Sequence, residues 1–308
     1  MRPLLPFVAF TGAVFARVNI MLPFYVYPTQ PDWQATIDTV NAHPNLHFYL
    51  VVNPSNGPTN STPDPYFNYT HGYNTDWTTG VAKLNNLANA QTIGYVSTSY
   101  NNGKNNRTRE AVIADIDNWS QWKEQQSDNS PNANISIHGI WFDETSVDRE
   151  NYEFYQNLTA HARQAFNASE APQYTSVLNT GVAPDPAYER ELFDLADVVV
   201  TRETCWQYNS TENAAECPMP YVHYDVATLK NSSGLPNHTD LYPKASVIVH
   251  YVRPEPAVDA TILADQIKRT VELGIHSLYF TSAKLWNMTT IGPATVGAVA
   301  DAVDAAQP

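Results

Sequence analysis

The chain has 308 residues, and its 31 acidic and 17 basic residues give a formal net charge of −14. A phosphate backbone would be repelled by this charge, which excludes nucleic acid as a partner and allows a neutral or cationic one. The two cysteines are an even number, as expected for one disulfide in an oxidising compartment.

The N-terminal segment has the features of a secretory signal peptide. Residues 1–16 contain one basic residue, an apolar run and small residues close to position 16. Eleven N-x-[S/T] sequons follow, which is typical of a glycosylated secreted protein of a eukaryote. No later segment supplies about 18 apolar residues in a row, so we expect no membrane contact. We predict a signal peptide at 1–16, one domain at 17–308, and a monomer that is secreted or held at the cell wall.

Short apolar segments alternate with helical patterns along the rest of the chain. The alternation predicts an α/β fold, and eight units predict a single closed (β/α)8 TIM barrel. The expected strands are 20–27, 46–52, 91–97, 135–142, 173–179, 196–201, 246–252 and 276–281. The expected helices are 31–43, 76–90, 108–125, 151–166, 186–196, 259–274 and 293–306, with 221–230 as a weak candidate after the sixth strand.

The fourth expected strand runs straight into two carboxylates. In the stretch GIWFDET, Asp143 and Glu144 follow a buried segment, at the end of the strand where TIM barrels carry their active sites. Acidic residues before a helix also act as caps, but Ser146 is the better capping candidate here. Consecutive strand residues point to opposite faces, so both carboxylates can serve one cleft only if the strand ends between them.

A third carboxylate follows the sixth expected strand. Glu203 and Arg202 are expected just past the barrel rim. Since strands four and six are about 10 Å apart at the backbone, inward side chains could bring their carboxylates to about 5–9 Å, the range of glycosidase pairs. This range does not choose between retention and inversion. The alternative is a salt bridge between Glu203 and the adjacent Arg202 or another surface base.

Aromatic residues near the expected strand ends favour a sugar ligand, because flat rings pack against the C–H faces of sugars. Each ring alone could equally belong to the core. The candidates are Tyr25, Tyr27, Tyr95, Tyr100, Trp206, Tyr251 and Trp286.

Other chemistries lack their motifs. The sequence has no G-x-S-x-G, H-E-x-x-H, G-x-G-x-x-G or P-loop, and its nine histidines show no metal-ligand spacing. We therefore expect no metal and no cofactor. Cys205 and Cys217 are better explained as a disulfide than as nucleophiles, and the bond would stiffen the segment after Glu203.

Several motifs occur in an order that resembles the spherulin-4 family of fungi and slime moulds. They are FYVYP, NPSNGP, GYVSTSY followed by DIDNW, and GIWFDE, and the resemblance extends from about Phe24 to the last strand. The fungal enzymes of that family form glycoside hydrolase family 135, which are endo-acting α-1,4-N-acetylgalactosaminidases. NPSNGP differs from the family form NP-x-SGP; its first residue, Asn53, is a substrate-binding candidate.

The resemblance implies a barrel that cleaves galactosaminogalactan with an acidic trio, matched here by Asp143, Glu144 and Glu203. We expect Glu144 or Glu203 to be the general acid and Asp143 to meet the developing positive charge, with or without attack by the substrate's acetamido group. Two alternatives stay open. One is a non-catalytic cell-wall or spore-coat barrel that binds polysaccharide, and the other is a related polygalactosaminidase.

Overall fold

The computed structural model describes residues 17–58, 75–101, 107–124, 133–168, 174–206, 224–229, 234–252, 259–282 and 293–307. The predicted signal peptide, Trp286 and Cys217 lie outside the described residues.

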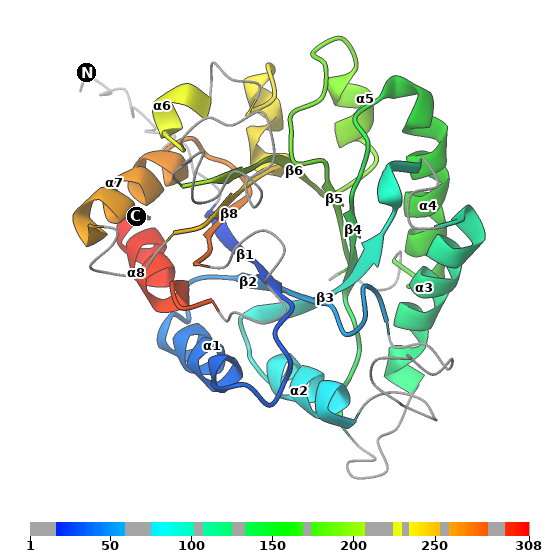
Figure 1. The fold of residues 1–308 in the computed structure, drawn as a ribbon, viewed down its shortest axis with the longest axis horizontal. Coiled ribbons are helices and arrows are strands. Elements are labelled where there is room, and N and C mark those ends of the chain that lie inside the picture. The colour runs from blue at the N-terminus through cyan, green and yellow to red at the C-terminus, as the bar shows by residue number, and fades with distance from the viewer. Residues whose placement is uncertain are drawn as a thin grey trace, which may run out of the picture.

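The eight predicted strands form one closed parallel barrel, each hydrogen-bonded to the next and the last to the first (Figure 1). The sequence prediction of a single TIM barrel is therefore confirmed. The strands are β1 (Asn19–Phe24), β2 (Phe48–Val52), β3 (Ala90–Ser97), β4 (Gly139–Asp143), β5 (Thr175–Asn179), β6 (Val198–Cys205), β7 (Ala245–His250) and β8 (Ser277–Phe280).

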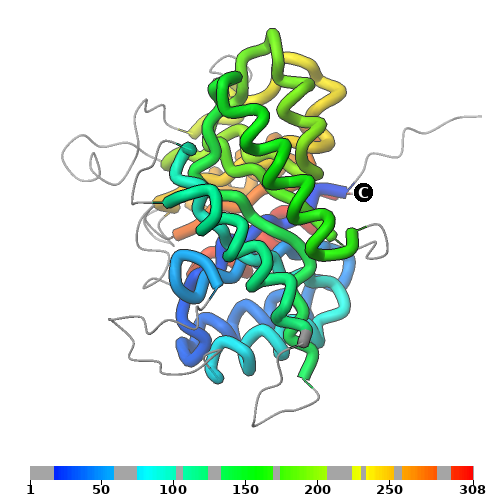
Figure 2. The backbone as a smooth tube through the Cα atoms, turned by 90° about the vertical axis from the view of Figure 1, so that its right-hand side faces the viewer, coloured from blue at the N-terminus to red at the C-terminus, as the bar shows by residue number. Residues whose placement is uncertain are grey.

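Helices surround the barrel, and α3 and α4 run side by side along one flank (Figure 2). The weakest predicted unit, after the sixth strand, has a helix of only four residues. The helices are α1 (Pro31–Ala42), α2 (Thr75–Asn85), α3 (Arg109–Gln121), α4 (Tyr152–Ala165), α5 (Glu189–Phe193), α6 (Val226–Leu229), α7 (Ala260–Val271) and α8 (Val296–Ala306). The 3₁₀ turns are η1 (Ser99–Asn101), η3 (Trp122–Glu124), η4 (Arg149–Asn151) and η5 (Thr239–Lys244). None of these helices, within the described ranges, is long and apolar enough to cross a membrane.

The apolar side chains divide into two cores, because successive strand residues point alternately into the barrel and out to the helices. The inner core includes Met21, Val51, Trp141 and Ile248, which fill the middle of the barrel. The larger outer core lies between the strands and the helices. The barrel is thus closed by packing at its centre, which leaves its two ends for polar groups.

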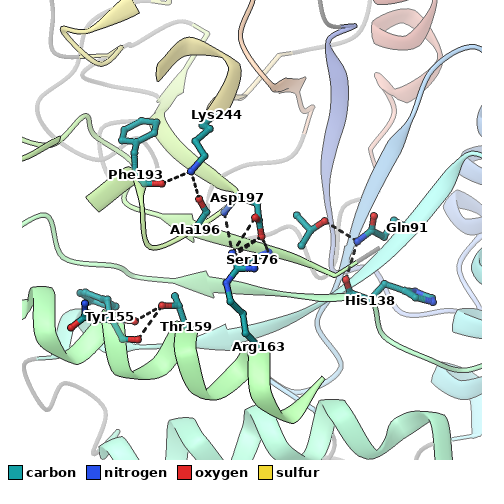
Figure 3. Close-up of polar contacts among 12 residues, drawn as sticks. Gln91, His138, Tyr155, Thr159, Arg163, Ser176, Phe193, Ala196, Asp197 and Lys244 are labelled. Carbon is teal, nitrogen blue, oxygen red and sulfur yellow. Dashed lines mark hydrogen bonds and ion pairs between the residues drawn. The ribbon is translucent and has the colours of Figure 1, made fainter. Parts of the chain in front are cut away.

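Polar side chains fasten the N-terminal end of the barrel, called the base below (Figure 3). Arg163 of α4 donates to both oxygens of Asp197 at 3.0 Å, and Asp197 accepts from the backbone and hydroxyl of Ser176 at 2.8 Å each. Lys244 donates to the carbonyls of Phe193 and Ala196 at 2.6 and 2.9 Å. These contacts join strands to the helical layer, and they lie at the end of a TIM barrel that serves stability.

Two histidines also lie at the base. The Tyr49 ring, which points inward from β2, lies between them, with centroids 4.7 Å from His47 and 5.4 Å from His276. Burial, with a further contribution from His47, lowers the pKa of His276 from its usual 6.5 to about 4. Folding therefore favours the neutral form of this ring.

Stability should consequently fall in acid. Between pH 6.5 and 4 the unfolded chain binds a proton at His276 that the folded chain does not, so this share of stability is lost as the pH falls. The loss should reach about 3 kcal/mol, since each pKa unit corresponds to about 1.4 kcal/mol. Urea unfolding at stepped pH should show it, and His276→Gln should give a shallower pH dependence than the wild type. Equal slopes would contradict this role of His276.

Candidate active site

Four polar side chains meet at the C-terminal end of the barrel, called the mouth below. Asp143, Asn179 and His250 are the last residues of β4, β5 and β7, and Glu203 is near the end of β6. All four lie on inward-facing positions of neighbouring strands. Parallel strands that end together therefore bring residues more than 100 positions apart in the chain into one cluster.

A single amide joins two of the predicted carboxylates. Asn179 Nδ2 donates to Asp143 Oδ1 at 2.7 Å and to Glu203 Oε2 at 2.9 Å. These two oxygens can be no farther apart than the two hydrogen bonds end to end, about 5.6 Å. The sequence expectation of two converging carboxylates is therefore met at the short end of its 5–9 Å range.

A β-bulge turns Glu203 into the barrel. Val200 pairs with Ser246 and Arg202 with Val247, so Thr201 is an extra residue in β6. In a regular strand the inward position after Val200 would be Arg202, but the extra residue moves it to Glu203, which pairs with the inner-core residue Ile248. The expectation that both residues lie past the rim was wrong, because β6 continues to Cys205 and contains them.

The turn after β5 holds this bulge in place. The backbone N–H of Gly181 donates to Val200 O at 3.0 Å, and the backbone N–H of Glu203 donates to Gly181 O at 2.9 Å. The Thr180 hydroxyl also donates to Val200 O, at 2.9 Å. Gly181 has a φ of +67°, and a Cβ there would contact Glu203 Cβ at 3.6 Å. The contact would be an ordinary van der Waals contact, so the left-handed backbone is what requires glycine here.

The predicted salt bridge between Glu203 and Arg202 is not formed. Glu203 accepts instead from His250 Nε2 at 2.6 Å on Oε1, and from Asn179 on Oε2. The Arg202 side chain is buried on the outer side of the strand, where burial lowers its pKa. The base beside Glu203 is therefore His250, whose side chain is 0% exposed, and not the Arg202 or surface base of the alternative interpretation.

Glu144 enters the mouth by a different route. β4 ends at Asp143, and Glu144 has a φ of +53°, so the backbone turns and this side chain need not follow the strand alternation. Its Oε2 accepts from Ser97 Oγ at 2.7 Å and from Ser99 Oγ at 3.3 Å. The condition under which both acids can serve one cleft, a strand that ends between them, is met.

The loop after β3 supports this turn with strained backbone. Ser99, Tyr100 and Asn101 have φ values of +47°, +55° and +54°, an uncommon run for residues with side chains. The Tyr100 N–H donates to Glu144 O at 2.7 Å, and the Thr98 hydroxyl donates to the carbonyls of Asp143 and Glu144. Strain of this kind is concentrated at functional sites, where surrounding contacts hold it.

The paired carboxylates differ in acidity. Burial raises the pKa of Asp143 to about 6, and the charge of Glu203 acts in the same direction against hydrogen bonds from Tyr95 and Asn179. Burial also acts to raise the pKa of Glu203, but the hydrogen bond and charge of His250, with Asn179, outweigh it and lower that pKa. Asp143 therefore keeps a proton to a higher pH than Glu203. This order is the reverse of the sequence expectation, which gave the proton to Glu144 or Glu203 and the charge to Asp143.

Three of the predicted aromatic residues lie beside the carboxylates. Tyr95 donates its hydroxyl to Asp143 Oδ2 at 2.7 Å, and its ring meets that of Tyr25 edge-on at 5.4 Å. Tyr100 is 41% exposed, and burial with the charges of Glu144, Asp143 and Glu203 raises its pKa to about 12. Tyr100 is therefore both close to the acids and open to a ligand.

The other predicted binding residues have different surroundings. Trp206 is 7% exposed and packs against Tyr224 and Phe280, an arrangement that favours a core role over a sugar platform. Tyr27 donates to Asp76 Oδ2 at 2.7 Å, beside α2. Asn53 accepts from Gly57 N at 2.9 Å and so shapes its own loop.

Tyr251, next to His250, is half-buried with a φ of +64°. Cys205 is disulfide-bonded, while Cys217, the other cysteine of the chain, lies outside the described residues.

The sequence interpretation missed Asn179, His250 and Ser97. The signal that located the acids was available for Ser97 and Asn179, which end predicted strands with polar side chains. His250 lies two residues before the end of the predicted strand 246–252, so its position at the strand end became visible only in the structure. Within the described residues no group of three or more histidine, cysteine or acidic side chains could hold a metal ion.

Comparisons with known proteins agree with the motifs. A protein-family model described as "Spherulation-specific family 4" matches residues 19–295. Spherulin-4 of Physarum polycephalum is 27% identical over 187 residues, which are 61% of this chain and 46% of that protein, so the match spans about half the length of this relative.

Solved structures share the fold. Sph3 of Aspergillus clavatus, in complex with GalNAc, superimposes with a TM-score of 0.66 and 22% identity over 94% of this chain and 98% of that one. The chitinase-like agglutinin of Robinia pseudoacacia gives a TM-score of 0.50 and 12% identity over 94% and 99% of the two chains. At these identities the likeness concerns the fold alone.

Removing the charge of Glu203 should change the pKa of Asp143 measurably. In Glu203→Gln the pKa of Asp143 should fall below about 6 but stay above its usual 3.8, because burial, the largest cause, remains. Carboxyl NMR titration of labelled aspartate would measure the change. Glu144→Gln is the matched control and should leave the pKa of Asp143 near 6, since Glu144 is not among the charges that raise it. An unchanged value in Glu203→Gln would contradict the coupling.

Proposed function

The chain belongs to spherulation-specific family 4, and we propose that it is a glycoside hydrolase that cuts within chains of α-1,4-linked N-acetylgalactosamine, as found in galactosaminogalactan. One observation carries the proposal: two half-buried carboxylates share the amide of Asn179, and one holds a proton more strongly than the other. Glycosidases need such a pair, one carboxyl to donate a proton and one carboxylate to meet positive charge at the anomeric carbon.

The roles follow from the order of pKa values. Asp143, whose pKa is raised to about 6, is the proton donor to the glycosidic oxygen in weakly acidic solution. Glu203, whose pKa is lowered, is the ionised group that faces the anomeric carbon. Glu144, held by Ser97 and Ser99, is placed to orient the substrate at the same mouth.

The spacing of the carboxylates supports retention of configuration. Retaining enzymes place their carboxyl groups about 5–5.5 Å apart, whereas inverting enzymes need about 6.5–9.5 Å to admit a water. Asp143 Oδ1 and Glu203 Oε2, the facing oxygens of the pair, lie within about 5.6 Å of each other and are bridged by one amide, which favours the shorter spacing of the retaining class. Glu203 makes the new bond to the anomeric carbon from the face opposite the leaving oxygen, and attack by water on that bond restores the configuration. The acetamido group of an α-linked N-acetylgalactosamine lies on the same face as the leaving oxygen and cannot displace it, so the expected route through this group is not available.

Two further observations support an amino-sugar polymer as the substrate. Sph3, whose fold is similar, was solved with GalNAc bound. The exposed ring of Tyr100 beside the acids offers a flat surface for a sugar face.

Loss of either paired carboxylate should abolish most of the cleavage. Asp143→Asn and Glu203→Gln should each reduce turnover by about 10²–10⁴-fold, because each removes a group acting in the transition state. Mass spectrometry of the oligosaccharides released from purified galactosaminogalactan would measure it, with chitin as the substrate control. Glu153→Gln, an exposed glutamate of α4, should behave like the wild type.

A good leaving group separates the two roles. On an aryl glycoside of the oligosaccharide, Asp143→Asn should recover much of its rate, because an aryl leaving group departs without being protonated. Glu203→Gln should stay slow on the same substrate, because it lacks the group that faces the anomeric carbon. Near-normal turnover of the polymer by both variants would contradict the proposal. Polymer binding by the wild type without any release of oligosaccharides would support a non-catalytic polysaccharide-binding protein instead.

The first product anomer tests the spacing argument. A retaining enzyme acting on an α-linkage releases the α-anomer first, before mutarotation in water. Proton NMR spectra taken during the first minutes of the reaction should show the α signal rising ahead of the β signal. Initial release of the β-anomer would show inversion and exclude this arrangement of Asp143 and Glu203.

A further inference from the structure

The His250 side chain is held against one carboxylate. Its Nε2 lies 2.6 Å from Glu203 Oε1, and its side chain is 0% exposed where that of Glu203 is 19% exposed. Its other ring nitrogen, Nδ1, is buried without a hydrogen-bond partner in the part of the chain that the structure describes. Glu203 is therefore the polar group that fixes this imidazole, and the burial keeps the ring out of reach of a substrate.

We propose that His250 is a positioning residue for the reaction above: its Nε2–H fixes the Glu203 carboxylate in the barrel mouth and keeps it ionised. The inference rests on the proposed function but assigns a role to a residue that the acidic trio does not include. His250 acts through Glu203, whereas Asp143 and Glu203 would touch the reacting atoms.

The two hydrogen bonds to Glu203 restrain the carboxylate fully. His250 donates to Oε1 and Asn179 donates to Oε2, so each oxygen has its own donor and the plane of the group cannot rotate freely. Hydrogen bonds to an ionised group are stronger than those between neutral groups, and they are lost if the carboxylate takes a proton. The arrangement therefore selects both an orientation and a charge state.

Without His250 the surroundings would favour protonation of Glu203. The titratable groups that face it from other elements are Asp143 of β4, Tyr25 after β1 and Tyr100 of η1, all of them acids. Burial also disfavours a charge at this position. Among the described side chains that shift the pKa of Glu203, His250 is the one that can carry a positive charge.

The backbone places this histidine. His250 pairs with Cys205 in the β6–β7 ladder, and its carbonyl accepts from Trp206 N at 2.8 Å. The β6–β7 ladder therefore joins the two strand ends that carry the donor and the carboxylate.

Two substitutions distinguish the loss of the hydrogen-bond donor of His250 from the loss of its packing. His250→Leu keeps a side chain of similar size without a donor, and His250→Gln keeps an N–H donor without a charge. His250→Leu should lower kcat on the polymer by about 10- to 100-fold, the usual effect of losing a hydrogen bond to a charged group, while KM changes less. His250→Gln should retain about tenfold more activity than His250→Leu. The acid limb of the pH profile should move to higher pH in both, and farther in His250→Leu.

His276→Gln is the matched control, since it makes the same change at the opposite end of the barrel and should leave the acid limb unmoved. Equal activity of the two His250 variants, an unmoved acid limb, or a rise in KM at constant kcat would overturn the proposal.

Direct titration distinguishes failure of this inference from failure of the proposed function. Carboxyl NMR of labelled glutamate should show a higher pKa for Glu203 in His250→Gln than in the wild type, whether or not the polymer is cut. An unchanged pKa overturns the role of His250. A raised pKa in a protein that cleaves no polymer upholds the control of Glu203 by His250 and rejects the glycosidase. If His250→Leu does not fold, the titration of His250→Gln decides.

Discussion

Two carboxylates held within about 5.6 Å of each other repel, and the arrangement of the mouth depends on how that repulsion is contained. The Asn179 amide donates to both groups, Tyr95 donates to Asp143 and His250 donates to Glu203, so the two carboxylates differ in the kind of their second donor. Glu203 gains the donor that can carry a positive charge, and Asp143 is left with the proton in weakly acidic solution. A pair in which both second donors were neutral would have no fixed division between acid and base.

Backbone irregularity at the mouth makes this placement possible, while the base stays regular. The bulge in β6 and the positive φ values of Glu144 and of η1 re-aim side chains that ordinary strands would send elsewhere. At the base, by contrast, the ion pair of Arg163 with Asp197 and the contacts of Lys244 join elements without such strain (Figure 3). Among the described residues with side chains, positive φ values are therefore concentrated at the mouth, with Asn167 after α4 as the exception, and the fastening contacts lie at the base.

Much of this arrangement could be predicted from residue patterns. Alternating strands and helices gave the barrel, and acidic residues at strand ends located Asp143 and Glu144. The position of Glu203 was predicted for the wrong reason, because a pleated strand that continues past residue 201 would have turned this side chain outward. The bulge depends on hydrogen bonds from Thr180 and Gly181, which belong to the turn after β5 and leave no local signal in β6.

The acidity of each carboxylate was beyond prediction for a similar reason. The order of the pKa values of Asp143 and Glu203 depends on burial and on His250, which is 47 residues from Glu203 in the chain and meets it only when the barrel closes. The aromatic residues show the same limit. Trp206 and Tyr100 both follow strand ends, but one is packed in the core and the other is exposed.

Thr201 adds one residue to β6, and this has a consequence for how relatives should be compared. Deleting it would restore even pleating and leave Glu203 opposite Ile248 on the barrel's interior wall, with Arg202 still facing outward, while every other strand kept its partner. Two homologues could thus share all eight strands and the inward glutamate, and differ by one residue in the length of the sixth strand. An ungapped alignment across this segment would match the wrong residues, so the length of the sixth strand has to be compared before its acids are.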